Sequence, residues 1–282
     1  MCPATWPLLS IALLMTTAIH AQETDGATSA SETRTVSPLR KLLDESLAWD
    51  ELLTSEEATE PMTVQVVMRW ANPPRGSGDG MTVLYLSEGR PEAVCCVYRW
   101  GRKLTHEFDS LSRGTLIARR NGAVVWRPAT PGPQFKPIPG ADAPADSPAA
   151  RLRQMKTLAG QFSSTMLGWR ANKSDREELR LLPQPLYRYD SRRSDVLDGA
   201  VFAFVQGTDP ESLLLLEAFQ AADGFEWQFG FARRTSGRLE GRHQGTIVWQ
   251  VPGFPQHKDP LRTHIRLRRE IDPNVLQDLE KK

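Results

Sequence analysis

Two segments in the second half of the chain are apolar at every position. Residues 201–205 read Val-Phe-Ala-Phe-Val, and residues 213–216 are four successive leucines. An antiparallel strand with one face in water alternates between apolar and polar residues, so strands that do not alternate must be covered on both faces. The sequence therefore predicts a layered body. One face of the sheet meets an amphipathic helix, and the other meets a companion unit, a long loop or an apolar ligand; we favour packing within the chain.

Two helices are predicted to begin at Ser-Pro pairs. Ser37 precedes Pro38, and Ser147 precedes Pro148, a pairing typical of a helix N-cap followed by the first helical position. Apolar residues then recur at helical spacing. We expect the apolar face of the first helix to carry Leu39, Leu42, Leu43, Trp49 and Leu53, and that of the second to carry Leu152, Met155, Leu158, Ala159, Phe162 and Met166.

Strand patterns separated by turn residues follow each helix, which predicts an α+β fold of antiparallel β-meander sheets, each backed by an amphipathic helix. The first helix-plus-meander unit covers residues 37–127 and the second covers residues 147–251. Residues 128–146 hold six prolines, which are excluded from helix interiors and central strands, so we expect a linker there. Residues 252–282 are predicted to form a basic strand and a C-terminal helix.

The two units end in similar sequences. Residues 116–126 align without a gap with residues 239–249, and leucine, arginine, glycine, valine and tryptophan coincide in the two segments. Asn121-Gly122 is a strong signal for a two-residue β-hairpin turn. The match, together with the shared Ser-Pro starts, favours two duplicated helix-plus-sheet units. Convergence on a common hairpin sequence is the alternative.

The N-terminus indicates export. Residues 1–21 contain no charged side chain, and residues 8–19 form an apolar stretch that has the length of a signal peptide but is short for a membrane span. We expect cleavage after Ala21 and a secreted or periplasmic protein without a transmembrane span; a retained anchor or an ordinary cytoplasmic N-terminus are the alternatives. Residues 22–36 are rich in Ser, Thr, Ala and acidic residues, which predicts a flexible acidic tether.

Several functional classes are disfavoured by composition and spacing. The net charge of +1 argues against a nucleic-acid binder. We find no spacing typical of a metal site, no serine nucleophile motif and no signal for a cofactor. Cys95 and Cys96 are neighbours that point to opposite faces of a strand, so they are expected to be core residues and not a metal clamp.

The densest group of chemically able side chains is His106, Glu107 and Asp109. An imidazole and carboxylates can perform general acid and base catalysis if the fold brings them together around a substrate. Strand alternation places His106 on the face opposite Glu107, however, so the local geometry does not by itself form a catalytic pair. A purely structural role for these three residues is the alternative.

Aromatic and basic residues recur at matching positions of the two similar segments, at Trp126 and Trp249 and at Arg119 and Arg242. Such side chains can form a binding surface, and they can equally anchor a β-rich core with a polar rim. We take these four residues as candidate binding residues.

Five short segments carry a resemblance to a known family. They are residues 89–93, 106–110, 135–139, 181–188 and 198–210. On these segments, residues 66–252 resemble a family of uncharacterised, predicted-exported bacterial proteins. The resemblance implies no activity, cofactor or catalytic residue.

We therefore expect a non-catalytic extracytoplasmic binding or interaction protein with an apolar groove or sheet surface, whose partner is an apolar small molecule or an envelope protein. One alternative is an exported hydrolase-like enzyme that uses His106 with Glu107 or Asp109. The other is a structural component of a cell-envelope assembly, in which the acidic tether and the C-terminal arginines dock to different neighbours. These arginines are Arg262, Arg266, Arg268 and Arg269.

Overall fold

The computed structural model describes residues 37–72, 77–168, 175–190, 195–253 and 258–280. The predicted signal peptide and acidic tether lie outside the described residues. In the described ranges the chain is mostly β, with three antiparallel sheets and three short helices. The predicted antiparallel sheets are thus confirmed, with less helix than an α+β class implies. None of the helices described has the length and apolar character needed to cross a membrane.

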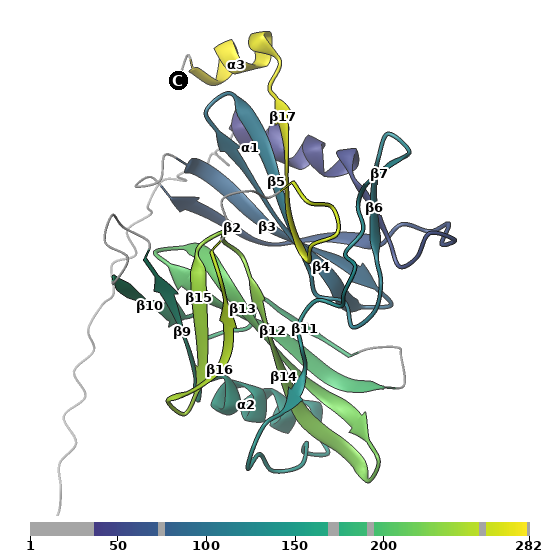
Figure 1. Ribbon diagram of the computed structural model, residues 1–282, viewed down its shortest axis with the longest axis vertical. Coiled ribbons are helices and arrows are strands. Elements are labelled where there is room, and N and C mark those ends of the chain that lie inside the picture. Colours follow the sequence, from purple (N-terminus) through teal and green to yellow (C-terminus); the bar gives the residue numbers. More distant parts are fainter. Residues whose placement is uncertain (1–36, 73–76, 169–174, 191–194, 254–257, 281–282) are drawn as a thin grey trace, which may run out of the picture. The chain divides into compact units, whose positions relative to one another are not determined.

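The first sheet has five strands in the order β17-β5-β4-β3-β2 (Figure 1). Its strands are β2 (Thr63–Asn72), β3 (Ser77–Ser87), β4 (Arg90–Trp100), β5 (Lys103–Ser110) and β17 (His264–Glu270). β2 to β5 form a meander, and β17 then returns from the C-terminal end of the chain to pair with β5, with Leu267 opposite His106. The C-terminal basic segment is therefore the edge strand of the first sheet.

A helix and a small sheet cover one face of the first sheet. α1 (Pro38–Ser46) begins as expected, because the Ser37 side chain accepts a hydrogen bond from the Arg40 N–H. A 3₁₀ turn (Leu47–Trp49) and β1 (Glu51–Leu53) follow. β1 pairs with β6 (Ile117–Arg120), which pairs with β7 (Ala123–Trp126). α3 (Pro273–Glu280) adds Leu276 to the same core.

The second sheet follows the order β16-β15-β9-β10-β12-β13-β14-β8, with β11 also paired to β12, and it curls into a half-barrel (Figure 1). Its strands are β8 (Lys136–Pro137), β9 (Phe162–Leu167), β10 (Arg176–Leu181), β11 (Tyr187–Tyr189), β12 (Val196–Gln206), β13 (Asp209–Ala221), β14 (Gly224–Arg233), β15 (Arg238–His243) and β16 (Thr246–Val251). α2 (Pro148–Ala159) begins with the expected cap, in which Ser147 accepts from the Ala150 N–H.

The uninterrupted apolar segments are β12 and β13, and both of their faces are covered. Phe202, Phe204 and the four leucines of residues 213–216 are at most 1% exposed. Phe202 and Leu214 belong to the core beneath α2, whereas Leu213 and Leu215 pack with Leu84 and Val94 of the first sheet. The predicted intramolecular packing is confirmed: a helix lies on one face and the first sheet on the other.

Both helices are shorter than the apolar spacing predicts. α1 ends at Ser46, and Leu53 lies in β1; α2 ends at Ala159, and Phe162 and Met166 lie in β9. Gly160 caps α2 and starts the turn into β9. Phe162 and Met166 point into the same core as α2, which is why the apolar spacing appeared to continue there; in β1 it is Leu52, not Leu53, that joins the core of α1.

The proline-rich segment, residues 128–146, contributes a strand to the second sheet. Lys136 and Pro137 form the edge strand β8 on β14, and the Ile138 N–H donates to the Trp227 carbonyl. Proline is tolerated there because an edge strand leaves some N–H positions unpaired. The segment that we expected to be only a linker is therefore a packed part of the second sheet.

The two halves follow one order of elements. In the second sheet, the hairpin β15–β16 pairs with β9, the strand that follows α2. The meander β10-β12-β13-β14 continues the sheet from β9, and the edge strand β8 pairs with β14. In the first half, the hairpin β6–β7 lies beside β1 in the same way, and the Met62 N–H donates to the Leu52 carbonyl at 2.7 Å where the chain enters β2. Both hairpins turn through two residues of positive φ, Asn121-Gly122 and Gln244-Gly245, as a type I′ turn requires.

Candidate functional site

His106 lies in a buried chain of polar side chains that does not include the two acids of its own strand. Its Nδ1 is 2.7 Å from Asp50 Oδ2 and its Nε2 is 3.0 Å from Ser46 Oγ. Glu107 and Asp109 point to the opposite face of β5, as the alternation of the strand requires. The structure therefore does not bring His106 together with either predicted catalytic acid.

Ser46, His106 and Asp50 are linked in the order of a serine hydrolase triad, but this triad is closed to solvent. Ser46 is 0% exposed and His106 is 1% exposed, and the Ser46 hydroxyl donates to the Leu43 carbonyl at 2.7 Å. The Trp49 ring stacks on the His106 ring, with 5.4 Å between centroids. A nucleophile must reach a substrate carbonyl, so this arrangement serves packing in the conformation described.

Asp50 holds that polar chain in place. Burial alone would raise the pKa of the Asp50 carboxyl, but its hydrogen bonds to His106 and to Arg120 lower the pKa overall. Arg120 binds both carboxylate oxygens at 2.7 Å. Because Arg120 belongs to β6, this contact ties the hairpin β6–β7 to α1 and to the first sheet.

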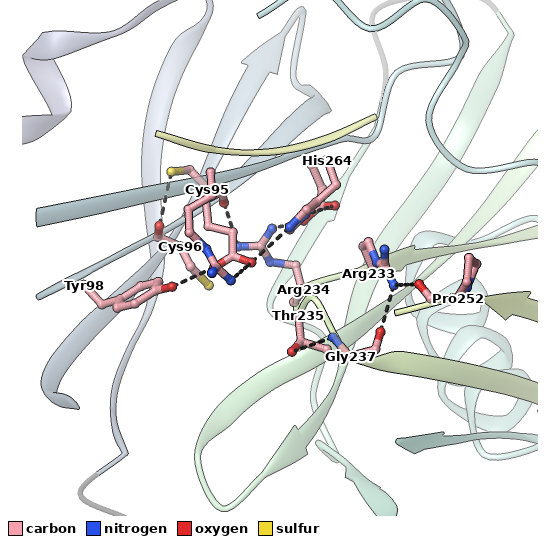
Figure 2. A network of polar contacts seen from close by, with 12 residues as sticks. Cys95, Cys96, Tyr98, Arg233, Arg234, Thr235, Gly237, Pro252 and His264 are labelled. Carbon is pink, nitrogen blue, oxygen red and sulfur yellow. Dashed lines mark hydrogen bonds and ion pairs between the residues drawn. The ribbon is translucent and has the colours of Figure 1, made fainter. Parts of the chain in front are cut away.

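Glu107 and Asp109 meet the second sheet and the C-terminal strand. His264 lies between them, with Nδ1 2.8 Å from Asp109 Oδ1 and Nε2 3.0 Å from Glu107 Oε1. Arg234, which follows β14, forms an ion pair with Asp109, and Arg266 binds Glu107 at 2.9 Å. Figure 2 shows Arg234 extending from the second sheet toward His264 and Cys96 of the first. We name His264, Glu107, Asp109, Arg234 and Arg266 the junction network.

The junction network shifts the ionisation of its members. Burial alone would lower the pKa of His264, but the Asp109 and Glu107 carboxylates outweigh burial and raise it. Burial alone would raise the pKa of Glu107, but hydrogen bonds from His264 and the charge of Arg266 hold it well below the usual range of a glutamate. The charged forms of His264 and Glu107 are therefore both favoured, as expected for an ionic contact between two sheets.

Cys95 and Cys96 are buried free thiols, as the sequence predicts for core residues. Burial raises the pKa of Cys96 to about 12, so the thiol stays protonated and unreactive at neutral pH. The described part of the chain contains no group of three or more ligating side chains placed to hold a metal ion.

Three of the four candidate binding residues have structural roles in this conformation. Trp126 is 0% exposed, and its indole N–H donates to the Arg262 carbonyl at 2.8 Å. Arg119 donates to the Glu56 carbonyl. Arg242 is half-buried and forms an ion pair with Glu240.

Trp249, the fourth candidate, lines a groove of about 740 Å³. One wall is formed by β14 and β16 and the other by residues 130–135, and the floor reaches the ends of β5 and β17. We name it the Trp249 groove. Its apolar lining includes Pro131, Pro133, Phe135, Phe231, Trp249 and Val251, and its polar lining includes Asp109, Ser110, Arg113, Thr130, Gln134, Arg233, Gln250 and Thr263. This volume and mixed lining are usual for a site that binds a small ligand.

The aromatic wall of the groove depends on two close approaches to glycine. Phe231 stacks on Trp249 with 5.2 Å between ring centroids and 11° between ring planes. A Cβ at Gly241 would lie 2.9 Å from the Phe231 ring, and a Cβ at Gly230 would lie 2.8 Å from Pro133 Cβ. Only glycine therefore lets the Phe231 ring lie flat on β15 and lets the proline-rich wall rest on β14.

Arg233 is a buried cation that lines the groove together with Arg113 and the Asp109 carboxylate. Arg233 is 7% exposed, and Arg233 Nη2 donates to the carbonyls of Gly237 and Pro252 (Figure 2). The carboxylates that act on Arg233 are Asp109 and Glu107, which are shared with the other basic members of the junction network. Burial, together with the charge of Arg262, therefore lowers the pKa of Arg233 despite these acids.

A second, more polar pocket of about 610 Å³ lies on the other side of Arg113. Two of its lining residues, Arg90 and Arg113, bind the fully buried Glu217, which also accepts a hydrogen bond from the Tyr189 hydroxyl. The Arg113 guanidinium is also sandwiched between Phe135 and Phe219, at 3.7 and 4.0 Å from the ring centroids. The Arg113 side chain is therefore held in place and forms a wall shared by this pocket and the Trp249 groove.

The residues that complete these clusters lie far from His106, Glu107 and Asp109 in sequence. Ser46 and Asp50 belong to the first helix region, and His264 to the last strand, so no local motif links them to β5. The return of β17 to the first sheet was the missing information, since the basic strand predicted within residues 252–282 had no assigned pairing partner.

Comparison with protein-family models, with curated proteins and with solved structures gives no match to this chain. The resemblance to a family of uncharacterised exported proteins therefore stays a prediction, and the function has to be argued from the groove itself.

Proposed function

We propose that this protein is a non-catalytic binding protein and that the Trp249 groove is its binding site. The observation that carries the proposal is a stacked Phe231–Trp249 wall in a groove that is large enough for a small ligand and is also lined by Arg233. The groove would accept a ligand with an apolar part against the indole and an anionic or hydrogen-bond-accepting part near Arg233. The closed Ser46–His106–Asp50 chain supports binding over hydrolysis.

We also propose that the protein is exported and acts outside the cytoplasm. The uncharged, apolar N-terminal stretch supports this proposal. Binding outside the cell membrane would make an envelope protein or a small apolar molecule available as a partner. A structural role in an envelope assembly would use the same groove as a docking site.

Finally, we propose that the two halves descend from one duplicated helix-plus-sheet unit. The shared order of elements, the type I′ hairpins and the matching segments that end in Trp126 and Trp249 support it. Under this proposal the two tryptophans occupy equivalent positions, opposite Ala118 in β6 and opposite Gly241 in β15.

The binding proposal can be tested with anilinonaphthalene sulfonate, an aromatic anion whose fluorescence rises in apolar sites. We expect saturable binding to the folded protein and at least tenfold weaker binding to Trp249→Ala, because the aromatic wall is lost. Trp100→Ala is the matched control: Trp100 is 51% exposed at the end of β4 and lies outside the groove. Equal binding to wild type and Trp249→Ala, or a loss of binding in Trp100→Ala alone, would refute the proposal.

A further inference from the structure

The first sheet ends in a long strand whose outer side is open. β2 is the edge strand of this sheet and is paired on its inner side with β3. Residues 63–66 are exposed on both faces of the strand, and Val64 and Val66 are 40% and 37% exposed. Within the described ranges, no hydrogen bond reaches the outer side of these four residues. Their outward N–H and C=O groups are therefore available to another strand.

The other sheet edges in the described part of the chain are short or carry residues that oppose strand pairing. β17 exposes Arg268, Arg269 and Glu270, and β8 is two residues long and contains Pro137. β1, β7 and β16 have six residues or fewer. Charged residues, prolines and short length are the usual protection of a sheet edge. β2 has ten residues, and its first charged residue is Arg69.

The part of β2 that can accept a strand has defined ends. A register shift after Val66 marks a bulge at Val67, where regular pairing with a further strand would stop. Beyond the bulge, the Thr208 hydroxyl donates to the Ala71 carbonyl at 2.9 Å, so that end of β2 is bonded to the turn between β12 and β13. Residues 63–67 remain, which is a usual strand length, and we name them the open edge.

The open edge is nearly symmetric about Gln65. Val64 and Val66 flank this glutamine, and Thr63 and Val67 are two further β-branched residues outside them. If two antiparallel copies pair about a two-fold axis at Gln65, Val64 of one copy lies opposite Val66 of the other. The two glutamines then lie opposite each other, and each amide offers the other both a donor and an acceptor. The open edge is therefore complementary to a second copy of itself.

We propose that two copies of this chain pair through their open edges about this two-fold axis, so that the two first sheets form one continuous sheet. The valine pairs extend the apolar face of β3, where Tyr85 and Val83 lie beside Val64 and Val66. The strand pair is smaller than a standard interface, so we expect a reversible dimer with a micromolar dissociation constant. The residues that line the Trp249 groove do not include any from β2, so this inference is independent of the proposed function.

Charges at the two-fold axis test the pairing, with sedimentation velocity as the measurement. Gln65→Lys and Gln65→Glu each place two like charges opposite one another, so either variant alone should dimerise at least tenfold more weakly than wild type. An equimolar mixture of the two should regain the dimer, because lysine then lies opposite glutamate. Thr246→Lys and Thr246→Glu, at an exposed position of the edge strand β16, are the matched controls and should dimerise as wild type does.

Single cysteines test the register of the pairing in a Cys2→Ser background. Gln65→Cys should form an intermolecular disulfide on mild oxidation, because Cα atoms directly opposite in an antiparallel pair are about 4.5–5.5 Å apart. Val64→Cys should not, because Val64 lies opposite Val66 and is about 7–8 Å from its own counterpart. Cys95 and Cys96 are buried and do not compete. Non-reducing electrophoresis reports the cross-link.

Each outcome bears on the inference. A wild type that sediments as a monomer up to millimolar concentration overturns it, and so does a dimer that both Gln65 charge variants leave unchanged. Cross-linking of Val64→Cys in place of Gln65→Cys would show that the axis is wrong. If wild type is monomeric but binds a capped peptide of residues 62–68, the edge takes a strand from another protein instead. Binding of anilinonaphthalene sulfonate should be the same in all Gln65 variants, so failure of the dimer leaves the proposed function standing.

Discussion

The hairpins β6–β7 and β15–β16 have the same turn, the same aromatic neighbour and a tryptophan at the same register, yet one tryptophan is sealed and the other lines a groove. The difference lies in the segment that leads into each edge strand. Residues 260–263 lie on Trp126 before β17 begins, whereas residues 130–135 stand apart from Trp249 before β8 begins. The course of a connecting segment can therefore close or open the space beside a tryptophan while the strands keep their aromatic residues.

The two halves also differ in where they hold charge. β5 presents Glu107 and Asp109 to the junction network, whereas the matching face of β14 presents Gly230 and Ala232. The first half is thus bound to the second by ions contributed largely from its own strands. The second half supplies Arg234, and it keeps its core beneath α2 apolar.

The largest expected effect is a difference in stability between the variants Trp126→Ala and Trp249→Ala. Trp126→Ala should lower the free energy of unfolding by about 3–5 kcal/mol, the range for removing a large buried aromatic side chain. Trp249→Ala should cost much less, about 1 kcal/mol, because part of that ring already faces the groove. Urea denaturation of both variants measures the difference. Equal losses would mean that Trp249 is as well packed as Trp126 and would remove the basis of the comparison.

A smaller effect tests the glycine beneath the aromatic wall. In Gly241→Ala the new methyl group would meet the Phe231 ring at 2.9 Å, so the ring must shift, at a cost of about 1–3 kcal/mol. The near-UV circular dichroism of the tryptophans should change, and binding of anilinonaphthalene sulfonate should weaken. Ala118→Gly, at the matching position of β6, is the control and should cost only about 1 kcal/mol through backbone entropy, with the dye affinity unchanged.

The pH dependence of stability tests the ionic contacts between the two halves. The pKa of His264 is raised above its usual 6.5, so its ion pairs contribute fully below about pH 6.5 and are lost as the pH rises through the raised value. The pKa of Glu107 and that of Glu217 are lowered from the usual 4.5, so their contribution is present above about pH 4.5 and is lost as the pH falls through the lowered values. We expect maximal stability between these limits.

His264→Gln distinguishes the junction network from the rest of the molecule. It should remove the loss of stability on the alkaline side while the acid side persists, since Asp50 and Glu217 still titrate there. Denaturation midpoints measured across this pH range provide the check. An alkaline slope that is identical in wild type and variant would show that His264 does not form the charged contact described.

The smallest expected effect is none at all. Because the Ser46–His106–Asp50 chain is closed, a fluorophosphonate probe should not label Ser46 in the folded protein, and simple esters should not be hydrolysed above the background rate. His106→Ala should reduce stability through the lost contacts to Asp50 and Ser46. Labelling that disappears in Ser46→Ala would show that the site opens in solution, and it would restore the hydrolase alternative.

Much of the fold follows from the sequence, and the exceptions have clear physical causes. Uninterrupted apolar strands and Ser-Pro caps predict the layers and both helix starts, because these signals are local. The helix ends were placed too far along the chain. Phe162 and Met166 point into the core of α2 from β9, and Leu52, not Leu53, joins the core of α1 from β1. The pairings of β17 with β5 and of β8 with β14 depend on contacts between distant segments, which no short pattern encodes.

The candidate site was predictable only in part. The matching segments identify Trp249, but they also identify Trp126, and nothing in either segment says which ring is covered. That depends on residues 130–135 and 260–263. Similarly, Glu107 and Asp109 were identified as a charged cluster, whereas their partners His264 and Arg234 become visible only when the two sheets are packed together.

The position of β17 has a consequence for how the chain is made. A ribosome completes β2 to β5 before the second half, whereas β17, the strand that pairs with β5, follows β16. Until β17 emerges, β5 is an unpaired edge with Glu107 and Asp109 uncompensated, and the nascent first sheet remains unfinished while the entire second half is synthesised. The first sheet can therefore be completed only after the second half has been made.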